Sequence, residues 1–220
     1  MEKVLITFPS IHNGIIKSKD NPSDPNNFVS VVNGYAIVST PYSVISVDLM
    51  DYFINYITID ETQKPAFIKL LQWMEGKHFT SEFWSYLTSW NDVFVIDDTS
   101  VCVSGDKFEK ILHYTEEEEI DVKSLLNLIV LNSKSGKYQL GSIGVSNVTL
   151  KIIDKTIGKL IQKNSLIFEF ISLNSTIRFT VDNMPCIFGI VLSSNAVTSK
   201  QFLFDGFKQF CLKAELKLIS

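Results

Sequence analysis

The sequence predicts an α+β fold in which antiparallel sheets carry helices on one face. Short runs of apolar and β-branched residues are joined by tight turns, of which Asn33-Gly34 is the clearest, and such turns are too short to connect parallel strands. Single amphipathic segments precede runs of strands, which is typical of α+β proteins. The order of one helix followed by three strands occurs twice, so we expect repeated units.

The first 76 residues begin with a strand and a loop, because the prolines and asparagines of residues 9–27 disfavour helices and inner strands. A hairpin follows, in which Asn33-Gly34 supplies the positive φ angles of a two-residue turn. Two helices come next, the second with Pro65 in its first turn and Gly76 at its end. We expect strands at residues 4–8, 28–32, 35–39 and 44–47, and helices at 48–56 and 62–76.

The first repeated unit begins with a helix at residues 80–90 that Thr80 or Ser81 caps. This helix is expected to bury Phe83, Trp84 and Leu87, with Trp90 at the end of the same apolar face. Residues 97–100 favour a turn, and three strands are expected at residues 93–96, 101–103 and 108–114.

The second repeated unit begins with a helix at residues 146–163, followed by strands at 166–173, 176–181 and 185–192. In the middle strand, apolar Ile177, Phe179 and Val181 alternate with polar residues, which is the pattern of a sheet with one buried face. The strands at 28–47 resemble the same triplet without a convincing helix before it.

The remaining segments complete two predicted halves of the chain, residues 1–115 and 116–220. The acidic run 116–119 precedes a helix or strand at 122–131, and a solvated flank is the commoner use of such a run. Residues 199–218 place apolar side chains at helical spacing and predict a closing helix.

Composition sets limits on the class of protein. The chain has 220 residues, 45% of them hydrophobic, and a net charge of -4, so any nucleic-acid contact must come from a local basic patch. Cys102, Cys186 and Cys211 have apolar neighbours and no CxxC spacing, which predicts reduced, buried thiols. No run of apolar residues is long enough to cross a bilayer, so we expect a soluble, cytoplasmic protein without membrane contact.

The sequence contains no motif that indicates a reaction, a metal or a cofactor. His12, His78 and His113 lack the spacing of metal ligands, and no nucleophile elbow or phosphate-binding glycine loop is present. The neighbouring Asp97 and Asp98 are typical turn residues and would point to opposite faces of a strand. We therefore expect a binding protein and not an enzyme, with no metal or cofactor.

The helix at residues 146–163 is the best candidate site. Lys151, Lys155, Lys159 and Lys163 recur every fourth residue and form one stripe along it, while isoleucines and leucines lie on the opposite side. A solvated lysine face is the commoner use of such a helix. The alternative is a row of ammonium groups that contacts the phosphates of a nucleic acid.

Five stretches together resemble DNA sliding clamps, in particular the bacterial β clamp. They are residues 32–49 (VNGYAIVSTPYSVISVDL), 76–87 (GKHFTSEFWSYL), 93–104 (VFVIDDTSVCVS), 141–160 (GSIGVSNVTLKIIDKTIGKL) and 166–193 (LIFEFISLNSTIRFTVDNMPCIFGIVLS). The resemblance implies repeated units whose helices line the hole of a ring and whose lysines face duplex DNA. In this chain it implies that role for Lys151, Lys155, Lys159 and Lys163.

Two functions therefore remain open. The first is a DNA-sliding-clamp-like processivity factor that binds duplex DNA without sequence specificity, contacts replication proteins or other partners, and assembles as a homo-oligomer. The second is a protein-interaction or assembly module of the same fold that binds no nucleic acid. Two features depart from the clamp pattern: only two complete units are present, and the helix at residues 80–90 carries no lysine.

Overall fold

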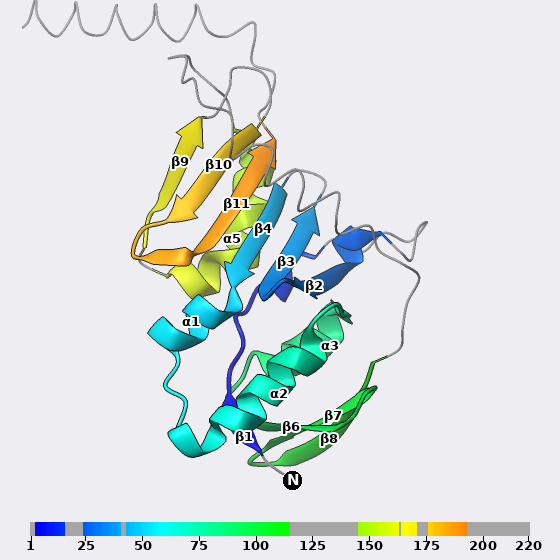
Figure 1. Cartoon of the computed structure of the whole chain (residues 1–220). Coiled ribbons are helices and arrows are strands. Elements are labelled where there is room, and N and C mark those ends of the chain that lie inside the picture. Colours follow the sequence, from blue (N-terminus) through cyan, green and yellow to red (C-terminus); the bar gives the residue numbers. More distant parts are fainter. Residues whose placement is uncertain are drawn as a thin grey trace, which may run out of the picture.

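A computed structural model describes residues 3–15, 24–40, 43–114, 145–162, 164–170 and 176–192. Within these ranges the protein is a mixed α/β structure with two antiparallel sheets and four α-helices. Figure 1 shows the larger sheet above the smaller one, with α2 (Lys64–Met74) running between them. The predicted α+β class with antiparallel strands is confirmed.

The larger sheet has seven strands in the order β5-β2-β3-β4-β11-β10-β9. Strands from both predicted halves of the chain meet where β4 pairs with β11, and there Ile45 lies opposite Gly189. A Cβ at Gly189 would lie 2.5 Å from the Phe179 ring, so glycine lets this ring lie across the junction. The strand bounds are β2 (Phe28–Val32), β3 (Tyr35–Thr40), β4 (Ser43–Asp48), β5 (His78–Thr80), β9 (Leu166–Phe170), β10 (Thr176–Val181) and β11 (Met184–Leu192).

Two tight turns fix the register of this sheet. Asn33 and Gly34 have φ angles of 53° and 78°, as predicted for the β2–β3 hairpin. The carboxylate of Glu75 accepts hydrogen bonds from both backbone N–H groups, at 2.6 and 3.0 Å, so the turn is tied to the end of α2. In the β10–β11 hairpin, Asn183 is the turn residue with a positive φ angle, 59°.

The smaller sheet has four strands in the order β1-β6-β7-β8. Asp97 is the last residue of β6 and Asp98 begins the β6–β7 turn, which Oδ1 of Asp97 closes by accepting a hydrogen bond from the N–H of Thr99 at 2.8 Å. These carboxylates are turn residues, as predicted. The strand bounds are β1 (Val4–Ile6), β6 (Asn91–Asp97), β7 (Ser100–Gly105) and β8 (Phe108–His113).

The two short strands are exchanged between the sheets. β1 precedes the β2–β4 triplet in the chain, yet it pairs with β6 of the other sheet. β5 precedes the β6–β8 triplet, yet it pairs with β2. β5 was not predicted, because three residues of which the last is a helix cap carry no periodic signal of their own. The exchange ties the two sheets to each other.

The helices begin at residues that cap them. The carboxylate of Asp48 accepts from the N–H of Asp51, and the hydroxyls of Thr80 and Ser146 accept from the N–H groups two or three residues later. Pro65 lies in the first turn of α2, as predicted. The helix bounds are α1 (Leu49–Tyr56), α2, α3 (Ser81–Leu87) and α5 (Asn147–Ile161), with short 3-10 turns at η1 (His12–Gly14), η2 (Pro25–Asn27) and η3 (Glu61–Gln63).

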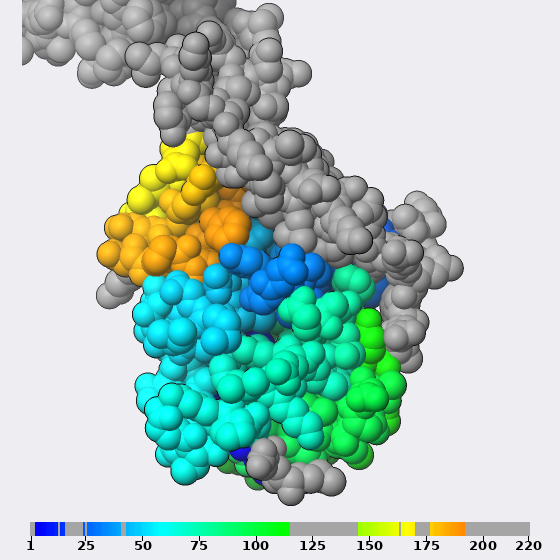
Figure 2. Space-filling model, in the orientation of Figure 1, coloured from blue at the N-terminus to red at the C-terminus, as the bar shows by residue number. Residues whose placement is uncertain are grey.

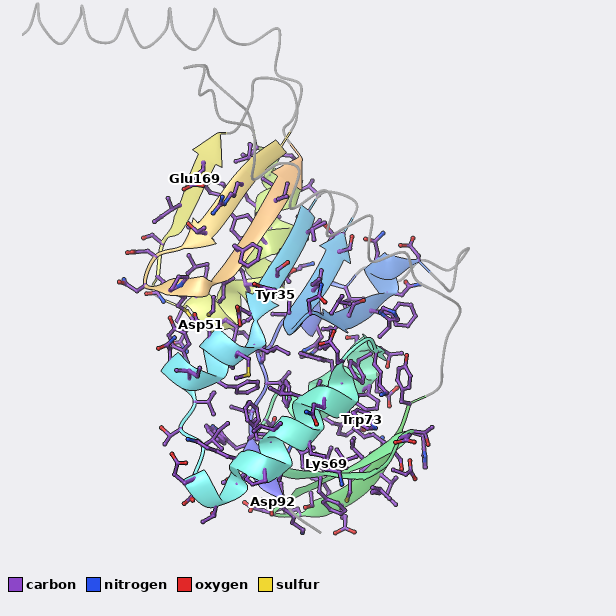
Figure 3. The ribbon with its side chains drawn as sticks, in the orientation of Figure 1. Tyr35, Asp51, Lys69, Trp73, Asp92 and Glu169 are labelled. Atoms are coloured by element: carbon purple, nitrogen blue, oxygen red, sulfur yellow. The ribbon has the colours of Figure 1, made fainter. Side chains whose placement is uncertain are left out.

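Aromatic side chains fill the space between the sheets. The fully buried Trp84 donates from Nε1 to the carbonyl of Pro9 at 2.9 Å, and its ring meets that of Phe8 edge to face. Trp73, labelled beside α2 in Figure 3, stacks on Phe83 and donates to the carbonyl of Asp98 at 3.0 Å. This core connects α2 and α3 to both sheets.

The structure differs from the expectation for Trp90, which is 56% exposed. The cause is that α3 ends at Leu87, so Trp90 is not on its apolar face. Cys102 and Cys186 are free and buried, as predicted. Cys211, the segments 116–119, 122–131 and 199–218, and Lys163 lie outside the described residues.

Candidate nucleic-acid interface

The lysine-bearing helix is α5, which covers most of its predicted range. It starts after Ser146, whose hydroxyl accepts the N–H of Val148 at 3.1 Å, and it ends before Gln162, where φ becomes positive. Such a cap fixes where the first turn begins, and therefore which residues share each face. Figure 1 shows α5 behind the seven-stranded sheet.

One face of α5 is buried against η1 and β11. Ile153 and Ile157 are fully buried, and Ile152, next to the lysine stripe, is only 9% exposed. Thr156 is buried too, and its hydroxyl donates to the carbonyl of Ile152 at 2.8 Å, which satisfies a polar group that water cannot reach. Burial of this face prevents α5 from rotating, so its lysines have a fixed direction.

Lys151, Lys155 and Lys159 all lie on the exposed face. None of the ion pairs in the described ranges involves these three side chains, so their charge is not neutralised by a neighbouring carboxylate there. Asp154 is the acidic residue of α5. It lies on the row next to the lysines, where its Oδ1 is close to Gly158. The structure thus presents three of the four predicted lysines together.

The first turn of α5 differs from the expectation. Leu150 was placed on the apolar face but is 38% exposed, and Val148 is 53% exposed. The buried face is instead completed by Thr149, which is 1% exposed. Successive residues are about 100° apart around the helix axis. Val148 and Leu150 therefore fall at the edges of the face that packs against η1 and β11, and they stay exposed. Apolar side chains therefore lie next to Lys151.

His12 is a neighbour of the lysine row that the sequence did not indicate. It lies in η1, and burial together with the charge of Lys159 lowers its pKa below the ordinary value of 6.5. Its Nδ1 is buried and has no hydrogen-bond partner among the described residues. A distance of 147 positions separates the two residues, so no local pattern could have predicted their proximity.

Lys110 is a second cation that sequence reasoning did not place. It extends from β8 to α3, where its Nζ donates to the Tyr86 hydroxyl at 2.7 Å and lies 4.1 Å from the centre of the Tyr86 ring. Glu82 is 3.9 Å away. α3 itself contains no lysine, but the neighbouring strand β8 brings a positive charge to it.

The described residues offer little reactive chemistry. They contain no group of three or more His, Cys, Asp or Glu side chains that could hold a metal ion. Burial raises the pKa of Cys102, and burial with the nearby Asp51 raises that of Cys186 to about 12, so both thiols stay protonated at neutral pH. A protonated thiol is a poor nucleophile and a poor metal ligand.

A second surface feature is an apolar groove between α1 and α2. Figure 2 shows this region in cyan and blue-green on the face turned to the viewer. Its larger part is a cavity of about 480 Å³, and Met50, Ile54 and Ile68 are 47, 73 and 51% exposed along it. Exposed apolar side chains gathered in one place are typical of protein-binding surfaces. The other lining residues of the cavity are Phe53, Ile57, Thr58, Ile59, Glu61, Lys64 and Phe67.

Comparison of the chain with protein-family models, with curated proteins and with solved structures found no match. Among the described residues, no helix is both long enough and apolar enough to cross a membrane.

Proposed function

We propose that this protein is a non-catalytic, sliding-clamp-like protein that holds duplex DNA through α5 without reading its sequence. The observation that carries the proposal is the row Lys151, Lys155 and Lys159, which is exposed on a helix whose other face is buried. Lysine is a flexible point charge that neutralises phosphates but lacks the forked geometry that reads a base edge. Contact through this row is electrostatic and independent of sequence.

The strand exchange supports the clamp-like part of the proposal. β5, α3 and the β6–β8 triplet follow one another in the chain, and β1, η1 and the β2–β4 triplet follow in the same order, with η1 in the position of the helix. The first strand of each set pairs with the first strand of the other triplet. Such a reciprocal arrangement is what two copies of one strand-helix-triplet unit would form.

The test is a salt titration of duplex binding. Each phosphate neutralised on duplex DNA contributes about -0.9 to the slope of log affinity against log salt. Replacing Lys151, Lys155 and Lys159 with glutamine should therefore flatten the slope by up to about three units, and including Lys163 by up to about four. Because Lys151, Lys155 and Lys159 are exposed to solvent, the triple variant should keep its thermal stability.

The matched control replaces three exposed lysines elsewhere, Lys64, Lys69 and Lys107, with glutamine. It changes the net charge equally but leaves α5 intact, so we expect a slope close to that of the wild type. If both variants flatten the slope equally, net charge and not α5 is responsible. If the wild type does not bind duplex DNA at low salt, the proposal fails.

The groove between α1 and α2 favours a second candidate, a protein-interaction module that binds no nucleic acid. Met50 and Ile68 line both the larger cavity and a neighbouring one of about 300 Å³ that reaches Glu75, so the apolar surface continues along the two helices. An extended apolar groove between helices suits a helical or extended peptide. Absence of duplex binding in the salt titration would favour this function.

A further inference from the structure

The hairpin between β2 and β3 contains a pair of residues that can react with each other. Its turn is Asn33-Gly34, an asparagine followed by the one residue that has no side chain. In such a pair the backbone nitrogen of the glycine can attack the side-chain carbonyl carbon of the asparagine, because no Cβ hinders the approach. Asn33 is exposed at the tip of the hairpin, so its amide is open to water.

The reaction of this pair is deamidation, which needs no enzyme. The nitrogen of Gly34 gives its proton to the solvent and forms a bond with Cγ of Asn33. The bond between Cγ and Nδ2 then breaks, Nδ2 takes up a proton and leaves as ammonia, and a cyclic imide remains. Water opens the imide at either carbonyl. Opening at Cγ gives aspartate, and opening at the backbone carbonyl gives isoaspartate, in which the main chain runs through the former side chain.

Glu75 holds the nitrogen that would attack. Its Oε2 accepts the N–H of Gly34 at 3.0 Å, and its Oε1 accepts the N–H of Asn33 at 2.6 Å. Glu75 follows directly on α2, and its own N–H donates back into the last turn of that helix, so the carboxylate has a fixed origin. The carbonyl of Gly34 accepts the N–H of Leu49 at 3.0 Å. Gly34 is therefore held at both its N–H and its C=O.

The contact with Glu75 slows deamidation for two reasons. Loss of the Gly34 proton beside a carboxylate places two negative charges together, and this disfavours the amide anion. The φ angles of 53° and 78° belong to a closed turn, which has to open before the nitrogen can reach Cγ of Asn33. Assistance by Glu75 as a base is a weak effect in comparison, because a carboxylate is a far weaker base than the amide anion that has to form.

We propose that Asn33 is a site of spontaneous deamidation and that the carboxylate of Glu75 controls its rate. While Glu75 binds the turn, the reaction is slow, and it proceeds when the end of α2 moves away from the hairpin. The product carries a negative charge beside Glu75, and like charges at adjacent positions repel. Isoaspartate also lengthens the main chain by one carbon, so the two-residue turn no longer fits. Deamidation thus releases the hairpin from α2 irreversibly.

The reactive turn lies at one end of the groove between α1 and α2. Gly34 and Glu75 line the cavity of about 300 Å³, together with residues that include Leu49 and Met50. Release of the turn from α2 therefore alters one wall of this groove and adds a negative charge to it. The modification does not involve α5, so it is independent of the proposed DNA binding.

Asn13-Gly14 is a second pair of the same type and serves as an internal control. It lies in η1, where the N–H of Ile15 donates to the carbonyl of His12 at 3.2 Å. Gly14 is buried against Thr156 of α5. Formation of an imide at this position would have to displace the backbone from α5, so we expect Asn13 to stay intact in the folded protein.

The first experiment follows both asparagines by peptide mass spectrometry while the full chain is incubated at neutral pH without DNA. We expect slow conversion of Asn33 to a mixture of aspartate and isoaspartate, and no conversion of Asn13. In the urea-denatured chain both should react, and Asn33 should react faster than in the folded protein. An Asn33 that stays intact, or that reacts equally fast in the folded and denatured chains, would overturn the proposal.

The second experiment changes Glu75. Glu75→Gln removes the charge and leaves one acceptor, and Glu75→Ala removes both acceptors. A hydrogen bond to a charged group shifts an equilibrium by about tenfold or more, and less at an exposed site. We therefore expect Asn33 to react roughly three- to tenfold faster in Glu75→Gln and faster still in Glu75→Ala. The control Glu82→Gln makes the same change of charge on α3 and should react at the wild-type rate.

Three results of the second experiment would contradict control by Glu75. An unchanged rate in both Glu75 variants would show that the contact has no influence on the reaction. A slower reaction in Glu75→Gln would show that the carboxylate assists removal of the proton. Equal acceleration at Asn33 and Asn13 would show that loss of the fold, and not loss of the contact with Glu75, is responsible.

Discussion

The backbone of Gly14 lies directly against Thr156, so that a Cβ at Gly14 would overlap the Thr156 side chain. This contact seats η1 on the buried face of α5, and it brings His12 close to Lys159 at the end of the lysine row. Gly14 has no side chain, and the buried hydroxyl of Thr156 donates to the carbonyl of Ile152, so neither residue is itself a binding group. Their close approach nevertheless sets the position of the proposed DNA-binding face relative to the rest of the protein.

Gly14→Ala should lower the free energy of unfolding by about 1 to 3 kcal/mol, because η1 and α5 must move apart to accommodate the new methyl group. Urea denaturation measures this change. The double variant Gly14→Ala/Thr156→Ala should recover part of the loss, since the hydroxyl nearest to the new atom is gone. The control is Gly158→Ala, whose Cβ meets only the movable carboxylate of Asp154 and should not destabilise α5. Equal losses in Gly14→Ala and Gly158→Ala would contradict this packing.

Trp84→Phe should cost more stability than Trp73→Phe. Both indoles donate a hydrogen bond to a backbone carbonyl, but the bond from Trp84 to Pro9 is buried and the bond from Trp73 to Asp98 is only partly so. An acceptor left unpaired away from water costs about 1 to 3 kcal/mol, whereas water replaces a lost partner near the surface. Chemical denaturation of the two variants measures the difference, and a larger loss for Trp73→Phe would be inconsistent with the burial of Pro9.

Stability should fall as the pH is lowered through the ordinary histidine pKa of 6.5. Burial lowers the pKa of His12 and His78 in the folded protein, with Lys159 adding to the shift of His12. Below pH 6.5 the unfolded chain therefore binds more protons than the folded one, and the free energy of unfolding decreases until the folded pKa values are passed.

Denaturation midpoints between about pH 7 and pH 5 measure this dependence. His12→Gln and His78→Gln should each make the profile flatter within that window. The His78 ring shares a 2.8 Å hydrogen bond with Ser30, so its replacement also lowers stability at pH 7. A variant profile as steep as that of the wild type would exclude the corresponding histidine as a cause.

Local features of the sequence determined several elements of this protein. Asn33-Gly34 fixed a hairpin because few other residue pairs accept two positive φ angles. Alternating apolar residues predicted the strand β10, and lysines at every fourth residue identified the exposed face of α5. These features depend on residues a few positions apart, whose geometry follows from the period of a strand or a helix.

Only the tertiary structure decided how these elements combine. The exchange of β1 and β5, the pairing of β4 with β11, and the meeting of His12 with Lys159 join residues that are between 48 and 148 positions apart. The exposure of Trp90 depends on where α3 ends, and the approach of Lys110 to Tyr86 depends on β8 lying beside α3. Such contacts arise from many weak packing interactions optimised together, and a pattern within one segment does not specify its distant partner.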